Sequence, residues 1–316
     1  MINPSISIII PVYNAALYVE KAIFSALQQP EVLEVLVVND GSTDGSDEIL
    51  QSIASTTTRV TLLFHPQRIN KGRSASRNLG LQHAIGTYIA FLDADDYYLE
   101  NRFTNDMKLF AQNAACDGVY NAIGTDFYRD PVTDLEKKNE LFTVRQRIAP
   151  DALFDALISG KHGHFSIDGL TVKKKVFGVA GLFNEELQVA EDTELLWKIA
   201  IKSRLESGIL DSPVAMRGVH DDNVCDNIDL YKIYTMKMYE SLLKWCSNNK
   251  VIYKIQDDLL KRIWIVKQKE NNALCVDIKY WFVLFVPNSN LFFSMLSVKY
   301  FPFIRYRQKL FSFLYR

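Results

Sequence analysis

The sequence predicts an α/β protein with a Rossmann-like, mixed but mostly parallel sheet flanked by helices, followed by a helical C-terminal extension. Two observations predict the sheet: β-rich runs alternate with helix-type segments over the first hundred residues, and polar residues follow several of these runs. A third predicts the extension, because the pattern turns helical from about residue 226. We therefore expect a sheet domain over residues 1–225 and a helical extension over residues 226–316.

Four β-rich runs mark the expected strands. They span residues 5–10, 33–38, 60–64 and 88–92. Pro11 and the turn-forming Asn14 are expected to close the first run. Strands that alternate with helices form parallel sheets with helices on both faces.

Helix-type spacing fills the gaps between these runs. Residues 15–29 carry apolar side chains that are available to one stripe of a helix. The members of that stripe are Leu17, Val19, Ile23 and Leu27. A second helix is expected to begin within residues 43–47, where Ser, Thr and Asp side chains can cap exposed N–H groups. Residues 74–85 form the third.

Polar residues gather where three of the strands end, at residues 11–14, 39–42 and 93–96. The carboxyl ends of parallel strands meet at one edge, and ligands bind there near the point where strand order reverses. Asp93 and Asp95 flank one small residue, which suits a divalent cation with oxygen ligands. Such a cation suits a bound diphosphate. The alternative is a solvated turn, which the convergence of three loops argues against.

The composition is that of an ordinary globular protein, with 48% hydrophobic and 23% charged residues among 316. A formal net charge of −1 argues against extensive nucleic-acid binding. The four cysteines are scattered without a Cys-x-x-Cys pair, which favours neither a zinc site nor a disulfide framework and indicates a reducing compartment. The N-terminus lacks a basic segment followed by an apolar stretch, so we expect no secretory signal and a cytoplasmic location.

Five motifs occur in an order typical of one known family. They are Ile-Ile-Ile-Pro-Val-Tyr-Asn (8–14), Val-Val-Asn-Asp-Gly-Ser-Thr-Asp (37–44), Asn-Lys-Gly-Arg-Ser-Ala-Ser-Arg-Asn-Leu-Gly (70–80), Phe-Leu-Asp-Ala-Asp-Asp (91–96) and Glu-Asp-Thr-Glu-Leu (191–195). This set resembles the family 2 glycosyltransferases, which have the GT-A fold. The resemblance is strong over about residues 5–100, thinner to about residue 225, and does not cover the tail. It implies transfer of a hexosyl-type sugar from a nucleotide-diphosphate donor to an acceptor hydroxyl, with inversion at the anomeric carbon.

The resemblance also implies which residues bind the nucleotide. Asp40 resembles the carboxylate that accepts a hydrogen bond from the ring N–H of a pyrimidine, for which uracil is our default. Pro11 and Tyr13 lie in the loop that lines the nucleotide pocket. Lys71 and Arg77 lie in the segment that reaches toward the nucleotide. A solvated helix start and a structural ion pair are the alternatives for these two residues.

Metal binding and catalysis are implied for a second group. Asp93 resembles the contact to the ribose or to a metal-bound water, and Asp95 the direct Mn²⁺ or Mg²⁺ ligand of the Asp-x-Asp motif. His220 resembles a late histidine that completes metal or diphosphate binding. An inverting displacement needs a base for the acceptor hydroxyl, and the resemblance assigns it to Asp192, with Glu191 as a neighbour or acceptor contact. The alternative is that both acids only favour the first turn of a helix.

The last forty residues combine cations with aromatic rings. From residue 278 onward the sequence has six Lys and Arg and no Asp or Glu. Residues 287–290 split its uncharged segment, and neither half supplies the 20 or so apolar residues that cross a bilayer. The composition favours peripheral contact with an anionic membrane, on its inner face. The alternatives are packing on the catalytic domain and a dimer contact.

The predicted function is a metal-dependent, inverting glycosyltransferase that builds a surface polysaccharide or lipid-linked glycan from a nucleotide-diphosphate sugar, with a UDP-sugar favoured. One alternative is a sugar-phosphate nucleotidyltransferase, but residues 11–14 lack the glycines and charge that follow the first strand in those enzymes. The other is a non-catalytic nucleotide-sugar-binding protein. The intact set of Asp93, Asp95 and Asp192 argues against that loss of chemistry.

Overall fold

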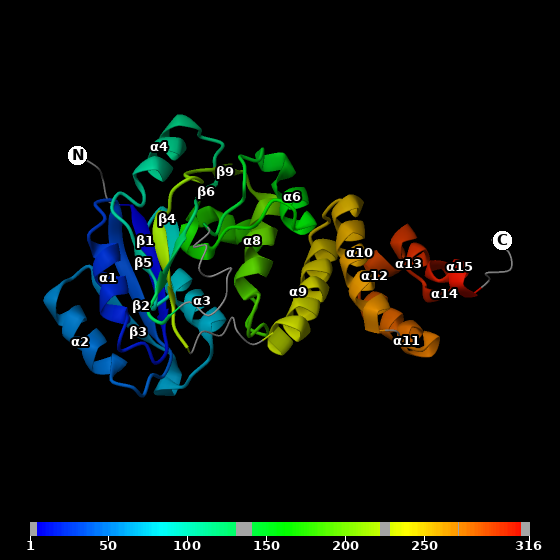
Figure 1. Cartoon of the computed structure of the whole chain (residues 1–316), viewed down its shortest axis with the longest axis horizontal. Coiled ribbons are helices and arrows are strands. Elements are labelled where there is room, and N and C mark those ends of the chain that lie inside the picture. The colour runs from blue at the N-terminus through cyan, green and yellow to red at the C-terminus, as the bar shows by residue number, and fades with distance from the viewer. Residues whose placement is uncertain (1–4, 131–140, 222–227, 271, 311–316) are drawn as a thin grey trace. The chain divides into compact units, whose positions relative to one another are not determined.

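The computed structural model describes residues 5–130, 141–221, 228–270 and 272–310. The chain forms two compact units, Met1–Asn227 and Ile228–Arg316 (Figure 1). Cys225 and the last six residues of the basic, aromatic tail lie outside the described ranges.

The first unit is built on a seven-stranded sheet in the order β3-β2-β1-β4-β8-β6-β9. Strands β3, β2, β1 and β4 are parallel, β8 is antiparallel to both of its neighbours, and β9 is parallel to β6. The strands are β1 (Ile6–Val12), β2 (Val32–Asn39), β3 (Val60–Phe64), β4 (Tyr88–Phe91), β6 (Gly118–Tyr120), β8 (Leu170–Lys173) and β9 (Leu205–Ser207). The predicted mixed, mostly parallel α/β sheet is confirmed.

Helices cover both faces of this sheet (Figure 1). On one face, Ile8 and Ile10 of β1 share a buried core with α1 (Val19–Leu27) and α2 (Ser46–Thr56). On the other face, α3 (Arg73–His83) packs on β1 at Ile9. The alternation along β1 follows from the two-residue period of a strand. The remaining helices of the unit include α4 (Thr104–Gln112), α6 (Leu153–Ser159), α7 (Phe177–Ala180) and α8 (Glu191–Lys202).

Gly80 allows α3 to approach the sheet closely. A Cβ atom at this position would lie 2.5 Å from Cγ2 of Ile9. The close approach fixes the height of α3 above β1, and therefore the position of the residues at its N-terminal end. Those residues contact the candidate site described below.

A small three-stranded sheet lies beside the edge where β1 and β4 end. Its order is β5-β10-β7, with β10 antiparallel to β5 and parallel to β7. The strands are β5 (Tyr97–Tyr98), β7 (Gly124–Phe127) and β10 (Ala215–Val219). A Cβ at Gly218 would overlap the carbonyl oxygen of Asp95, so only glycine lets β10 pass this close to the loop after β4.

Pro11 does not close the first strand, contrary to our expectation. Strand β1 runs to Val12, and Pro11 pairs in register with Val38 of β2. The carbonyl of Ile9 accepts from Leu92 and that of Val12 from Asp40, so the backbone groups of Pro11 face the β4 side. Strand β4 has ended by then, and the missing N–H of proline leaves no bond unmade.

Helix α1 begins at Val19 rather than near residue 15. The backbone N–H groups of residues 14–16 donate to side-chain oxygens in the loop before α2 and at its first residue, which holds this segment in a turn. The acceptors are, in order, Ser42, Ser46 and Asp44. Leu17 is therefore 87% exposed and does not join the apolar stripe, in which Val19 and Ile23 are fully buried.

The predicted caps of α2 act mainly on that neighbouring turn. Helix α2 follows Gly45, which has a left-handed φ of 95° and provides no side-chain cap. Only Asp44 serves the helix as expected, because its Oδ1 accepts from the N–H of Ser46. The polar residues before α2 thus tie two loops of the sheet edge together.

The described part of the second unit consists of helices. Its longest are α9 (Ile228–Asn248), α10 (Tyr253–Glu270) and α11 (Leu274–Phe285). Four helices of four or five residues follow: α12 (Ser289–Phe292), α13 (Met295–Lys299), α14 (Pro302–Arg305) and α15 (Arg307–Leu310). Trp264 of α10 is fully buried, and Trp281 of α11 stacks on Phe285 with ring centroids 5.0 Å apart. Among the described residues, no helix combines the length and apolarity needed to span a bilayer.

Candidate active site

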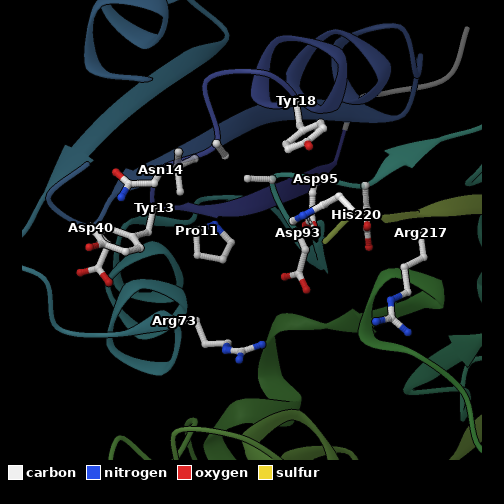
Figure 2. A pocket seen from close by; sticks show the side chains of 14 residues that line it. Pro11, Tyr13, Asn14, Tyr18, Asp40, Arg73, Asp93, Asp95, Arg217 and His220 are labelled. Atoms are coloured by element: carbon white, nitrogen blue, oxygen red, sulfur yellow. Dashed lines mark hydrogen bonds and ion pairs between the residues drawn. The ribbon is translucent and has the colours of Figure 1, made fainter. Parts of the chain in front are cut away.

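A pocket of about 550 Å³ opens at the carboxyl ends of β1 and β4. Six of the ten residues singled out from the sequence line it: Pro11, Tyr13, Asp40, Asp93, Asp95 and His220. Figure 2 shows Asp40 and Tyr13 at one end and Asp95 and His220 at the other, with Pro11 and Asp93 between them. The other four, Lys71, Arg77, Glu191 and Asp192, do not line the pocket.

Asp40 anchors the loop before α3 to the end of β2. Its side chain is buried, with Oδ1 2.7 Å from the N–H of Lys71 and Oδ2 2.8 Å from the N–H of Gly72. Nε2 of His65 lies 3.5 Å from Oδ1. Each carboxylate oxygen can accept two hydrogen bonds, so one acceptor position per oxygen remains. The side chain of Lys71 is exposed, and only its backbone takes part in this contact.

Asp95 and His220 meet although 125 residues separate them. Nε2 of His220 lies 3.1 Å from Oδ2 of Asp95. The imidazole ring stacks on Tyr18, with centroids 4.9 Å apart and an angle of 15° between the rings. Burial and the nearby Asp93 carboxylate raise the pKa of Asp95, and His220 acts in the opposite direction. The two residues predicted as metal ligands are therefore neighbours.

Asp93, which lines the pocket, forms an ion pair with Arg77, which does not. Nη2 of Arg77 lies 2.6 Å from Oδ1 of Asp93, whose side chain is one-third exposed. Burial would raise the pKa of Asp93, but the guanidinium groups of Arg77 and Arg73 outweigh it and lower that pKa. Asp93 is thus held as a carboxylate.

Arg77 also joins α3 to α8 through Glu191. Its Nη1 lies 2.9 Å from Oε1 of Glu191, and Nε of Arg73 lies 3.3 Å from the same oxygen. Arg77 and Glu191 are each 1% exposed. Burial and the adjacent Asp192 raise the pKa of Glu191, and the two arginines oppose this rise. Arg73 lines the pocket, so the network reaches the pocket wall.

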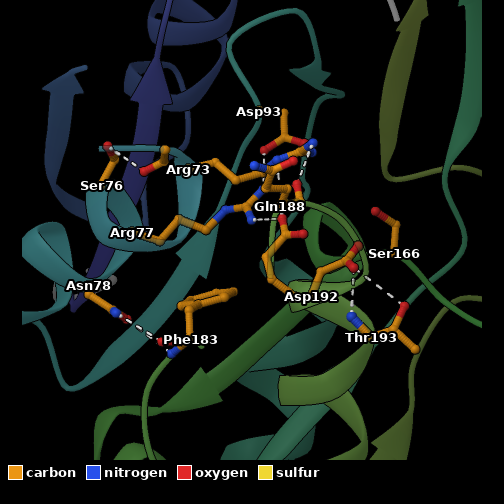
Figure 3. A network of polar contacts seen from close by, with 12 residues as sticks. Arg73, Ser76, Arg77, Asn78, Asp93, Ser166, Phe183, Gln188, Asp192 and Thr193 are labelled. Carbon is orange, nitrogen blue, oxygen red and sulfur yellow. Dashed lines mark hydrogen bonds and ion pairs between the residues drawn. The ribbon is translucent and has the colours of Figure 1, made fainter. Parts of the chain in front are cut away.

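Asp192 lies next to this network in the first turn of α8. Its side chain is partly exposed, and Oδ1 accepts from the N–H of Thr193 at 2.6 Å (Figure 3). Its negative charge acts on both Arg73 and Arg77. Asp40 and Asp95 line one pocket. Asp192 does not line it, but its charge acts on Arg73, which does.

A second acidic group lies below Asp93. Oxygen atoms of Asp93, Asp96 and Asp168 lie within 4.8 Å of one another. Burial and Asp93 raise the pKa of Asp168 to about 6, and burial together with Asp168 raises that of Asp96 well above its usual range. Oδ1 of Asp168 accepts from the N–H of Asp93, and Oδ1 of Asp96 accepts from the N–H of Gly218.

Comparison with known proteins identifies the family. The model of "Glycosyl transferase family 2" matches residues 7–167, which is half of the chain. The chain belongs to glycosyl transferase family 2. The predicted resemblance is confirmed.

Relatives and solved structures agree with this assignment. An uncharacterized glycosyltransferase of Haemophilus influenzae is 43% identical over 111 residues, 35% of this chain and 44% of the relative. Chondroitin synthase of Pasteurella multocida is 27% identical over 307 residues, 90% of this chain and 29% of the synthase. The chain thus spans less than half the length of these relatives. S. aureus TarS 1–349 in complex with UDP-GlcNAc has a TM-score of 0.59 and 18% identity, covering 82% of this chain and 71% of TarS. This likeness shows the GT-A fold.

Two groups in this family 2 glycosyltransferase could hold a divalent cation. Asp95 and His220 point into the pocket, and the repulsion between Asp93 and Asp95 is what a cation would relieve. The group of Asp93, Asp96 and Asp168 already has protein donors. The raised pKa values of Asp96 and Asp168 also favour protonated carboxyls, which are poor ligands. The first group fits a metal better.

Sequence reasoning missed several residues of this site. Arg73, Tyr18 and Arg217 line the pocket. Arg73 had a usable signal, because it lies four residues before Arg77 and so on the same face of the helix. Asp168 had none, because it follows an irregular segment and reaches the site only through the pairing of β8 with β4.

Proposed function

We propose that this glycosyltransferase moves a hexosyl group from a UDP-sugar to an acceptor hydroxyl with inversion and with Mn²⁺ or Mg²⁺ as cofactor. The observation that carries the proposal is the convergence of Asp95 and His220, 3.1 Å apart, in the pocket that Asp40 also lines. These residues come from three separate elements of the fold. Nothing in the packing of a core requires them to meet there.

The donor would lie along the pocket from Asp40 to Asp95. The unused acceptor positions of Asp40 suit a ring N–H of uracil, and Pro11 and the half-exposed Tyr13 provide apolar contact for the base. Arg73 and Arg217 line the same pocket and suit the diphosphate by charge and by their planar donors. S. aureus TarS has been solved with UDP and with UDP-GlcNAc, which supports this donor class.

Asp95 and His220 would hold the cation, and Asp93 would contact the ribose or a metal-bound water. The bound ion would supply Lewis-acid stabilisation of the nucleotide diphosphate as it leaves. The position of Asp95 beside the negative Asp93 supports this assignment, because a cation lowers the cost of ionising both carboxyls.

Asp192 would act as the general base. The acceptor oxygen forms a bond to the anomeric carbon, the bond from that carbon to the diphosphate breaks, and the hydroxyl proton passes to Asp192. Its partial exposure suits contact with an acceptor. The burial of Glu191 between two arginines suits a positioning role, in which Glu191 fixes the first turn of α8 and thereby Asp192.

The acceptor would be a growing surface polysaccharide or a lipid-linked glycan. Chondroitin synthase of Pasteurella multocida is among the relatives, which supports polysaccharide assembly. We assign catalysis to residues 1–225 and treat residues 226–316 as an extension, because every residue used above lies in the first range.

The donor and metal assignments are tested by thermal shift. The wild-type chain and Asp95→Asn are heated with UDP, GDP and CDP, each with and without Mn²⁺. A ligand at 100 times its dissociation constant stabilises by about 2.7 kcal/mol. We expect a Mn²⁺-dependent shift with UDP that Asp95→Asn loses. A wild type that ignores every nucleotide diphosphate would overturn the donor assignment, and an unchanged shift in Asp95→Asn would overturn the metal assignment.

The base is tested by release of UDP from a UDP-sugar in the presence of acceptor glycans. Asp192→Asn should lower turnover at least about a hundredfold, because a positioned base contributes roughly 10²–10⁴. Glu186→Gln, an exposed acid five residues before the helix, is the matched control. Equal turnover in the two variants would exclude Asp192 as the base. Absence of turnover in the wild type despite UDP binding would instead favour a non-catalytic binding protein.

A further inference from the structure

One face of α11 carries apolar side chains into solvent. Three of its exposed apolar residues and the C-cap residue that follows it share one stripe, because positions 276, 283 and 286 are seven and three residues apart and position 282 lies four before 286. They are Val276, Phe282, Val283 and Val286, with exposures of 49%, 50%, 64% and 52%. The opposite face is also apolar but buried, through Trp281, Leu284 and Phe285. The helix is therefore apolar on the side that packs and on the side that does not.

The buried face ties α11 firmly to its unit. Nε1 of Trp281 donates to the carbonyl oxygen of Ser297 at 3.0 Å. Asp277, the single acid of α11, is buried and accepts from the hydroxyl of Tyr306 at 2.9 Å. The helix is thus held with its acid directed inward, and the exposed stripe contains a cation, Lys279, but no anion.

The surrounding sequence adds positive charge. Residues 278–316 contain six Lys and Arg without an acid, whereas residues 1–277 contain 30 Lys and Arg against 37 Asp and Glu. The basic segment also exposes Phe293 by 84% and Met295 by 80%. Exposed apolar and basic side chains therefore occur together in a chain whose other residues are acidic in balance.

We propose that the exposed face of α11 docks on the surface of an anionic lipid bilayer. The apolar stripe would enter the boundary between headgroups and acyl chains while the exposed Lys279 contacts lipid phosphates. A polar protein surface would gain little from four adjacent apolar side chains. An acidic protein surface would attract the cations but would give no reason for the four apolar side chains to be exposed. The charge balance favours an anionic leaflet.

The proposal goes beyond glycosyl transfer and is tested without it. The full-length chain is floated with vesicles of phosphatidylcholine alone or mixed with phosphatidylglycerol, at low and high salt. Val283→Glu is compared with Ile252→Glu, since both side chains are 64% exposed and both belong to the second unit. We expect the wild type to float with anionic vesicles, to float less at high salt and to ignore neutral vesicles. Val283→Glu should bind about tenfold more weakly, and Ile252→Glu should bind as the wild type does.

Lys279→Glu provides a second variant that does not depend on apolar contact. It should weaken binding to anionic vesicles at low salt and reduce the salt dependence. Circular dichroism and melting temperature verify that each variant folds. A wild type that never floats, or equal flotation of Val283→Glu and Ile252→Glu, would overturn the proposal. So would a wild-type dimer in solution that only Val283→Glu dissociates, which would make this face a contact between copies of the chain.

Discussion

Replacing Arg77 by Met should destabilise the first unit severely. Arg77 is 1% exposed and its guanidinium bridges Glu191 of α8 and Asp93 of the loop after β4. Methionine keeps much of the side-chain volume but removes the charge and every donor. Glu191 would then be a buried carboxylate with Arg73 as its remaining guanidinium partner in this network.

The magnitude follows from the burial of each pair. Removing one partner of a buried ion pair costs about 3–5 kcal/mol, because the other charge stays desolvated. Arg73 remains 3.3 Å from Oε1 of Glu191, which puts this loss near 3 kcal/mol. The pair with Asp93, one-third exposed, adds at most about 1 kcal/mol. We expect a total of about 3–4 kcal/mol, a large share of a typical stability of 5–15 kcal/mol.

Urea unfolding followed by circular dichroism measures this loss, and a double-mutant cycle assigns it. Glu191→Gln removes the charge that Arg77 neutralises, so Arg77→Met should cost less in that background. The losses of unfolding free energy in the two single variants should therefore sum to more than the loss in the double variant, by more than about 1 kcal/mol. If the effects add within about 0.5 kcal/mol, or Arg77→Met costs less than about 1 kcal/mol, the network does not stabilise the fold as argued.

Three further predictions use other parts of the first unit. Between pH 4 and 6 Asp168 should be protonated to a greater extent in the folded chain than in the unfolded chain, because its pKa rises from its ordinary 3.8 to about 6. Its contribution to stability should therefore fall as pH rises, and Asp168→Asn should remove this part of the pH dependence, up to about 3 kcal/mol, in urea titrations with EDTA. Asp40→Asn leaves one of two backbone N–H groups without its acceptor and should cost about 1–3 kcal/mol, with faster proteolysis of the loop before α3. Gly80→Ala should lower the melting temperature by overpacking, at about 1–3 kcal/mol, whereas Gly178→Ala, with open space around it, should not.

Much of the fold could be predicted from short stretches of sequence. The expected runs at residues 60–64 and 74–85 correspond to β3 and α3 within two residues, because strand and helix periodicities are local properties. The same holds for the polar strand ends, of which Asp40 and Asp95 now line one pocket. Parallel strands bring their carboxyl ends to one edge whatever the details of packing.

Burial and partner choice were not predictable in this way. The sequence placed Leu17 in an apolar stripe, but a turn held by side chains of a later loop exposes it. A structural ion pair was one of the alternatives for Arg77, and Glu191 was expected to be a neighbour or an acceptor contact. The sequence did not indicate that the two would form a buried pair across 114 residues. Pro11 was expected to end the first strand, but β1 continues through it. The strand can continue because β4, on the side that the backbone of Pro11 faces, ends earlier.

The sequence by itself determined the fold class and the residues that gather at the edge of the sheet, because those depend on local periodicity and on which side chains follow each strand. Only the tertiary structure decided that His220 faces Asp95, that Asp168 lies beneath Asp93, and that Glu191 is enclosed by arginines. Each of these contacts joins segments 75 or more residues apart. The connecting segments carry no periodic signal that specifies where they return, so packing alone fixes these distances.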